Sequence, residues 1–302
     1  MTATVADRPA TGTQATAPAR RRRSGRSTLL TVAMLLCLVY FLLPIFWLVV
    51  ASTKANEDLF SSFGLWFSHM NLAENLHNVF TFQNGVFIHW MINSLVYAVV
   101  SGLGASSLAT AAGYAFAKYK FPGGDAMFTL VLGAVMIPMT ALAIPTYLLF
   151  AGANLTNTPW AVILPSLVSP FGVYLMRVYA ADAVPDSLIE AARVDGAGEM
   201  RIFFQIVLRL LVPASITVLL FALVASWNNY FLPLIMLNSP ELFPLPVGLA
   251  QWQAASAAGS GSQALFSTVI TGSLVSILPL MAAFLFLQRY WQSGLGTGAV
   301  KA

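Results

Sequence analysis

Charged side chains gather in one stretch of the sequence, residues 182–201, which reads DAVPDSLIEAARVDGAGEMR. Seven of these 20 residues are charged, compared with 9% of the whole chain. Long apolar segments border the stretch on both sides. Acidic and basic groups this close together suit recognition by ion pairs and hydrogen bonds. We therefore expect a partner molecule to bind this polar platform.

Other functional chemistry is sparse in the sequence. A P-loop needs a glycine directly before its lysine, and none of the four lysines follows a glycine. The three histidines, His69, His77 and His89, show no carboxylate pattern typical of a metal site. The single cysteine, Cys37, excludes an internal disulfide. We expect no cofactor, no metal and no catalytic residue.

The composition indicates what must position the platform. The 302 residues are 58% hydrophobic with a mean hydropathy of +0.77, which is typical of a polytopic membrane protein. A spanning helix needs about 20 mostly apolar residues. The uncharged run 126–176 would make a helix of about 75 Å, so it must cross twice, with a turn at the polar patch 152–159. We predict an all-α membrane protein with six transmembrane helices, at about residues 29–51, 87–117, two within 126–176, 210–237 and 264–288.

The basic residues predict the orientation. With a cytoplasmic N-terminus, 14 of the 15 Lys and Arg residues lie inside and only Lys54 lies outside, which places the C-terminus inside as well. This orientation explains the net charge of +4 without a nucleic-acid partner. Residues 1–26 are rich in Ala, Thr, Pro and Arg and have no apolar period, so we predict that they form a disordered basic cytoplasmic tail before a transmembrane domain at 27–302. A cleaved signal peptide is the alternative, but the first apolar run is too long for a typical one.

The predicted spans carry no Asp, Glu, Lys or Arg at their centres. Ion-coupled carriers and voltage sensors usually keep their working charges there. Because the chain also lacks a P-loop, its energy source must lie in another protein.

The charged stretch predicts two short helices joined by a glycine elbow. Pro185 and Asp186 favour a helix start, and Leu188, Ala191 and Ala192 should share one face. Residues 195–198 (DGAG) should break this helix in a left-handed turn. A second helix should then place Phe203, Ile206, Val207 and Leu210 on one face and run into the fifth span.

The spacing within this stretch is similar to the EAA loop of ABC importer permeases, EAA-x3-G-x9-I-x-L-P. The match runs from Glu190-Ala191-Ala192 through Gly196 to Ile206 and Leu208. One position departs, because Arg209 stands where that pattern has proline. We call residues 182–209 the EAA loop.

Further stretches resemble the carbohydrate importer branch, the MalG-like permeases. They cover the chain from about residue 29 to its end: 93–95 (NSL), 121–123 (FPG), 136–138 (MIP), 227–230 (WNNY), 245–249 (LPVGL), 288–290 (QRY) and 298–301 (GAVK). The resemblance implies the type I ABC importer fold in a bacterial cell membrane and a subunit without catalysis of its own. It also implies three partners: an ABC ATPase dimer, a second permease subunit that is usually a different chain, and an extracytoplasmic sugar-binding protein.

The resemblance implies that residues 186–194 dock into a groove of the ATPase. Glu190 would be a charged contact, and Gly196 would form the elbow. The full ATPase-coupling set would be Glu190, Ala191, Ala192, Asp195, Gly196, Ile206 and Leu208. The alternative is an interfacial helix on lipid headgroups with Glu190 solvated.

Aromatic rings beside amides suit a sugar, and this pairing suggests a substrate path. The candidates are Trp227, Asn228, Asn229 and Tyr230, with Asn93 and Tyr147 facing the same cavity. The alternative for the Asn residues is a hydrogen bond to a neighbouring helix.

Two further contacts follow from the resemblance. Gln251, Trp252 and Gln253 would meet the binding protein, and Gly298 and Lys301 would reach the ATPase. A passive linker is the alternative for the first segment.

The favoured function is therefore the permease subunit of an ATP-driven importer for sugars or oligosaccharides. Three alternatives stay open: an importer permease for another solute, an autonomous secondary carrier, and a membrane scaffold that uses the charged stretch to recruit a partner.

Overall fold

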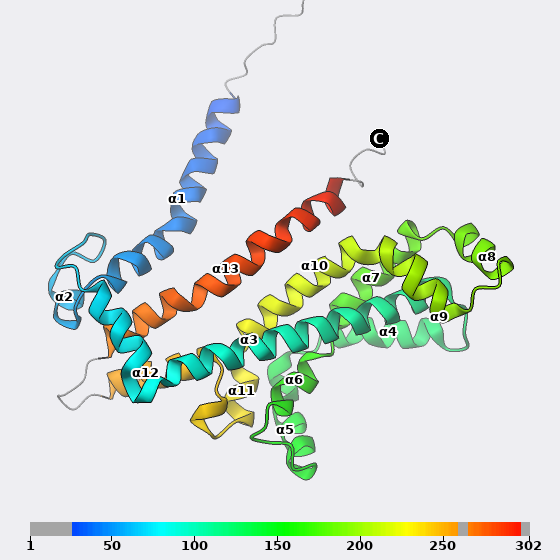
Figure 1. Cartoon of the computed structure of the whole chain (residues 1–302). Helices are drawn as coiled ribbons and strands as arrows, with labels where there is room; N and C mark the ends of the chain where they lie inside the picture. The colour runs from blue at the N-terminus through cyan, green and yellow to red at the C-terminus, as the bar shows by residue number, and fades with distance from the viewer. Residues whose placement is uncertain (1–25, 259–264, 297–302) are drawn as a thin grey trace, which may run out of the picture. The chain divides into compact units, whose positions relative to one another are not determined.

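The computed structural model describes residues 26–258 and 265–296, and every regular element in these ranges is helical (Figure 1). Residues 1–25 of the predicted tail 1–26 lie outside the described part, as do Gly298 and Lys301. The chain divides into two units, residues 1–46 and 47–302.

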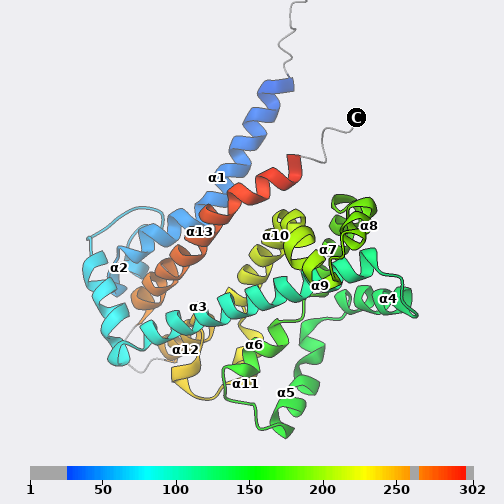
Figure 2. The same cartoon turned by 45° about the vertical axis from the view of Figure 1, so that its right-hand side comes forward.

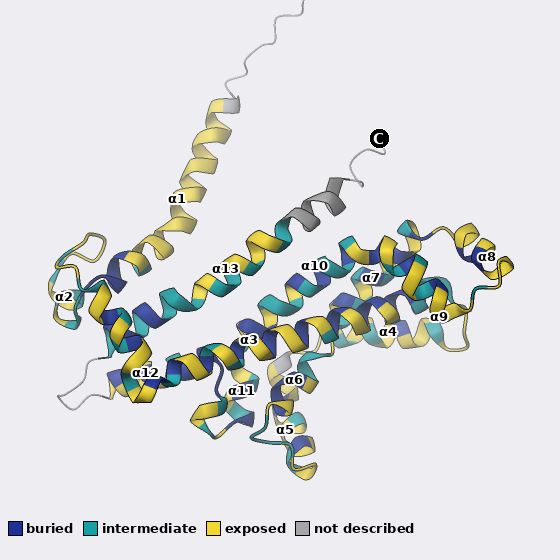
Figure 3. Cartoon of the chain, in the orientation of Figure 1, coloured by how far each residue is buried: buried dark blue, intermediate teal, exposed yellow. Residues whose placement is uncertain are grey.

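The first unit contains most of helix α1 (Arg26–Ser52). Residues 28–47 of this helix are all exposed, although almost all of them are apolar (Figure 3). A helix that is apolar on every side and long enough to cross a bilayer is a membrane span.

The second unit holds the remaining elements. They are α2 (Asn56–Ser61), α3 (Leu72–Lys118), α4 (Gly124–Val135), the 3-10 turn η1 (Met139–Leu142), α5 (Ala143–Gly152), α6 (Trp160–Ser166), α7 (Pro170–Ala183), α8 (Asp186–Val194), α9 (Glu199–Ile202), the π-helical turn η2 (Phe203–Val207), α10 (Leu208–Trp227), α11 (Phe231–Met236), the 3-10 turn η3 (Pro240–Leu242), α12 (Leu245–Ala257) and α13 (Phe266–Gly296).

Helices α3, α7 and α10 pack together through small and hydroxyl-bearing residues. A Cβ atom on Gly113 of α3 would lie 2.5 Å from Met176 Cβ of α7, so only glycine permits this approach. Ser106 of α3 donates to the Ser215 carbonyl of α10 at 2.7 Å, and Thr110 Oγ1 lies 2.9 Å from Ser215 Oγ. Close approach and hydroxyl hydrogen bonds are the usual means of helix association in membranes.

The six predicted spans are present if one broken span is counted. Five described helices are long and apolar enough to cross a membrane, and α4 with residues 140–152 makes the sixth, bent by 100°. Pro138, the residue before η1, lies at this bend, and proline is a common cause of a helix kink. The predicted turn is confirmed, because α5 ends at Gly152 and α6 begins at Trp160. The fifth span ends earlier than predicted, at Trp227, and α11 is a separate short helix.

Helix α3 also contains a sharp kink, at residues 82–85. Gln83, Asn84 and Gly85 all have positive φ angles there. The kink separates residues 72–81 from the predicted second span, which therefore starts at about the predicted position.

Candidate functional site

Helix α8 is the centre of the EAA loop, and it lies beside α9 at the end of the bundle where α3 ends (Figures 1 and 2). It begins at Asp186, as predicted, after Pro185 in an extended conformation. Ile189 and Ala192 are buried against the bundle. The opposite side exposes apolar surface, including Val194, whose exposed fraction is 88%.

The exposed apolar residues of α8 form a stripe. Leu188, Ala191 and Val194 are spaced by three, so they follow one another along one side of the helix. Leu188 and Ala191 share an exposed surface as predicted, but Ala192 packs into the protein's own core instead. Glu190 is also exposed.

A Schellman motif ends α8 and forms the predicted elbow. Gly196 adopts a left-handed φ of +80°. Its amide donates to the Arg193 carbonyl, and the Ala197 amide donates to the Ala192 carbonyl, both at 3.0 Å. These two bonds are the defining pair of the motif. The elbow therefore depends on the left-handed conformation that glycine adopts without strain.

A carboxylate bridges the two sides of the elbow. Glu199 at the start of α9 accepts from Arg193 Nε at 2.7 Å and from the Tyr119 hydroxyl at 2.5 Å. These two donors, Arg193 first, lower the pKa of the Glu199 carboxyl. Partial burial, and then the bond to Glu199, raise the pKa of the Tyr119 hydroxyl. The cluster joins α8 and α9 to the end of α3.

A second ion pair fixes the start of α8. Lys118 Nζ at the end of α3 lies 2.8 Å from Asp186 Oδ1, and the Lys118 side chain is only 8% exposed. Lys118 lowers the pKa of the Asp186 carboxyl through this hydrogen bond and its charge. Both ends of α8 are thus tied to α3.

A cavity of about 640 Å³ lies between α8 and the connection from α3 to α4. Glu190 and Arg193 of α8 line it, together with Arg177 of α7. The Arg177 guanidinium lies 3.7 Å from the centre of the Phe128 ring, a cation–π contact.

The second helix of the EAA loop runs without interruption into the fifth span, as predicted, from Glu199 to Trp227. Residues 203–207 form the π-helical turn η2, after which α10 runs on through Arg209. The exposed Arg209 lies within this helix, and the π-helical turn comes before the position that carries proline in the motif. Ile206 and Leu208 are half-buried and Asp195 is exposed. The predicted coupling residues therefore include both surface and packing positions.

The predicted substrate-path residues lie in different surroundings. Asn229 lines a mainly apolar cavity of about 670 Å³ between the broken span and α11. Tyr147 and Tyr230 are exposed, whereas Trp227 is buried in the core. The Asn228 side chain donates to the Val224 carbonyl of its own helix at 2.9 Å.

Asn93 forms hydrogen bonds within the protein, which was the alternative to a contact with the substrate. Its side-chain amide donates to the carbonyls of Glu241 and Phe243, at 2.6 and 3.1 Å. It therefore holds the connection between α11 and α12 against α3.

The predicted binding-protein segment lies in α12. Gln251 and Gln253 are exposed, but Trp252 is only 2% exposed and packs beside Trp90. Trp252 Nε1 donates to Gln83 Oε1 at 3.0 Å, which ties α12 to the kink of α3. No group of three metal-ligating side chains occurs among the residues the structure describes.

Sequence reasoning did not anticipate Lys118 and Tyr119 as parts of this site. Their partners lie 68 and 80 residues further along the chain, so no local spacing links them. The available signal was the charge pattern, since Lys118 is a cation predicted on the same side of the membrane as the acidic EAA loop.

The fold and the elbow define a class: a helical membrane protein with an exposed, partly apolar helix at one end of its bundle. One solved structure with this fold is a chain of a bacterial ABC transporter involved in the import of the acidic polysaccharide alginate. It matches with a TM-score of 0.76 and 22% identity, over 89% of this chain and 98% of that one.

The chain belongs to the family of binding-protein-dependent transport system inner membrane components, whose model matches residues 107–295. Members are transport subunits rather than enzymes, and the chain is a multi-pass protein of the cell membrane. It is similar to the arabinooligosaccharides transport system permease protein AraQ of Bacillus subtilis, with 36% identity over 90% of this chain and 95% of that protein. It is also similar to the lactose transport system permease protein LacG of Rhizobium radiobacter, with 29% identity over 85% and 90%. The resemblance to carbohydrate importer permeases is confirmed.

Proposed function

We propose that this chain is the permease subunit of an ATP-driven oligosaccharide importer and that it couples to a separate ATPase through α8. The relatives named for arabinooligosaccharide and lactose transport support an oligosaccharide as substrate. The partners of this proposal are an ATPase dimer, a second and different permease subunit, and an extracytoplasmic binding protein.

The observation that carries the coupling role is the exposed stripe of α8 on a rigid support. Exposed apolar residues on an otherwise polar helix are typical of a protein-binding surface. Leu188, Ala191 and Val194 present such a surface, and Glu190 adds a charge beside it. Because Ala191 carries only a methyl group, a partner can approach the helix backbone closely.

The support makes α8 suitable for transmitting movement. Lys118 and Tyr119, at the end of α3, hold Asp186 and Glu199. When a bound ATPase moves α8, these contacts pull on α3, which packs along α7 and α10. A rigid-body movement of the bundle is then the expected response, and it would alternate access to the substrate.

The substrate path needs the second permease subunit. The cavity at Asn229 is open on the described surface and lies beside the broken span, where irregular backbone is tolerated because it lines a cavity. Asn229 and Tyr230 would offer an amide and a ring to a sugar there. The exposed Gln251 and Gln253 would meet the binding protein.

Uptake in proteoliposomes tests this function. The complete complex should accumulate radiolabelled oligosaccharide only with ATP on the ATPase side and with the binding protein on the other side. Uptake driven by an ion gradient without ATP would indicate a secondary carrier instead. Normal assembly without any uptake would indicate a scaffold.

A further inference from the structure

An aromatic loop connects α2 to α3 and has no part in the proposed coupling. We define the aromatic loop as residues 63–70, FGLWFSHM. Phe63, Trp66 and Met70 are 73%, 65% and 72% exposed, and Leu65 and Phe67 are exposed as well. Residues 59–70 contain no Asp, Glu, Lys or Arg. A soluble surface rarely leaves so many apolar side chains uncovered in one short loop.

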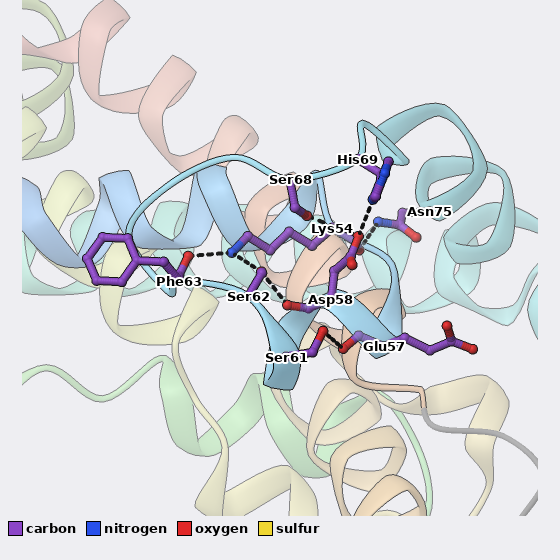
Figure 4. Close-up of polar contacts among 9 residues, drawn as sticks. All are labelled: Lys54, Glu57, Asp58, Ser61, Ser62, Phe63, Ser68, His69 and Asn75. Atoms are coloured by element: carbon purple, nitrogen blue, oxygen red, sulfur yellow. Dashed lines mark hydrogen bonds and ion pairs between the residues drawn. The ribbon is translucent and has the colours of Figure 1, made fainter.

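A buried lysine holds this loop in place (Figure 4). Lys54, two residues after α1, is 1% exposed. Its ammonium donates to the Phe63 carbonyl at 2.8 Å and to Ser62 Oγ at 2.9 Å. Figure 4 shows the Phe63 ring pointing away from this ammonium group. The side chain predicted as the one external cation is therefore turned inward to shape the loop.

Further hydrogen bonds close the loop at its other end. Ser68 Oγ donates to Asp58 Oδ2 at 3.0 Å, and His69 Nδ1 lies 3.5 Å from the same oxygen. The backbone N–H of Asn71 donates to the Thr53 carbonyl at 2.7 Å. The aromatic side chains are thus presented by a fixed backbone.

The loop returns along the last turns of α1. A Cβ atom on Gly64 would lie 3.8 Å from Trp47 Nε1, so the loop backbone runs beside Trp47. Trp47 lies five residues before the end of α1 at Ser52, which is about 7.5 Å along the helix axis. It belongs to the apolar stretch 28–52 that crosses the membrane. The loop therefore reaches the depth at which a span leaves the hydrocarbon core.

We propose that the aromatic loop inserts into the lipid headgroup region at this end of α1 and anchors the permease in that leaflet, with Lys54 as its positioning residue. Tryptophan and other aromatic side chains favour this zone because a ring combines an apolar body with a polar edge. The occupant of the surface is lipid, since the loop contains no Asp, Glu, Lys or Arg and its backbone runs beside Trp47 in the last turns of α1.

Spin-label accessibility in lipid nanodiscs tests the anchor with the full-length chain. Replacing the single cysteine, C37S, gives a background for W66C and F63C, each labelled with a nitroxide. Both labels should be relaxed more strongly by oxygen, which concentrates in lipid, than by a water-soluble nickel chelate. The control E57C, at an exposed position of α2, should show the opposite order.

Two outcomes would overturn the proposal. Greater accessibility to nickel at both loop positions would place the loop in water. Protection from both reagents would mean that protein covers it, such as the binding protein or another permease chain.

A second variant tests whether Lys54 positions the aromatic loop. K54M keeps the aliphatic stem but removes the donors to Phe63 and Ser62. The label at position 66 should then lose its preference for oxygen and become more mobile, while the label at position 57 stays unchanged. An unchanged label at position 66 would show that Lys54 does not position the loop.

Discussion

Replacing Gly196 with alanine should weaken the elbow of the EAA loop by a defined amount. A non-glycine residue in the left-handed region costs about 1–2 kcal/mol. No atom lies within 4 Å of the position of a new Cβ atom, so sterics add nothing to this backbone cost. The equilibrium between the formed and opened elbow should therefore shift by a factor of about 5 to 30.

Hydrogen exchange measures this shift directly. The Ala197 amide is protected by its bond to the Ala192 carbonyl, so its exchange in Gly196→Ala should accelerate by about the same factor. ATP-dependent uptake should fall as well. Gly198→Ala is the matched control, because Gly198 has a φ of −73° and equally open surroundings. The role of the left-handed turn would be refuted if the Ala197 amide were as protected in Gly196→Ala as in the wild type. It would also be refuted if Gly198→Ala lost as much protection as Gly196→Ala.

Three further predictions concern the platform and the bundle. Glu190→Lys should abolish uptake, while a membrane immunoblot should show normal amounts of the protein in the membrane. Asp182→Lys, at another exposed position, should keep uptake. Normal uptake in Glu190→Lys would show that Glu190 is not part of the docking surface. The folded-state pKa of Glu199 is lowered, so the contribution of Glu199 to the stability of the elbow is present above the unfolded pKa and is lost as pH falls through the folded pKa. The protection of the elbow amides from hydrogen exchange should therefore drop in acid. Glu199→Gln should abolish this pH dependence. Gly113→Ala should destabilise the protein by about 1–3 kcal/mol, seen as a lower Tm in detergent. Gly133→Ala, in the interior of α4 with open space around its Cβ position, should not lower the Tm.

Local sequence signals predicted the parts of the EAA loop that depend on local physics. Proline and aspartate at the start of α8 and glycine at its elbow act on the backbone within one turn. The face of α8 was harder to predict, because Ala191 and Ala192 are alike in sequence. Ala192 is the buried one because it packs into a core cluster with Met176 and Ile202, which lie on other helices.

The same distinction applies to the rest of the chain. Apolar length predicted the spans, because the bilayer thickness fixes it. It did not predict the bend of the third span or the kink at residues 82–85, where the positive φ of Gln83 and Asn84 depends on tertiary packing. Trp252 resembled an exposed contact residue in sequence but is a core residue, since its partners Trp90 and Gln83 lie on another helix.

Photo-crosslinking from α8 tests the central claim most directly. In the Cys37→Ser background, Val194→Cys carries a benzophenone on the exposed stripe, and Val178→Cys carries one on an exposed position of α7. In the assembled transporter, the label at position 194 should form an adduct with the ATPase subunit, and the label at position 178 should not. Absence of an ATPase adduct from position 194, with lipid adducts in its place, would contradict the account and indicate a helix that merely rests on the membrane surface.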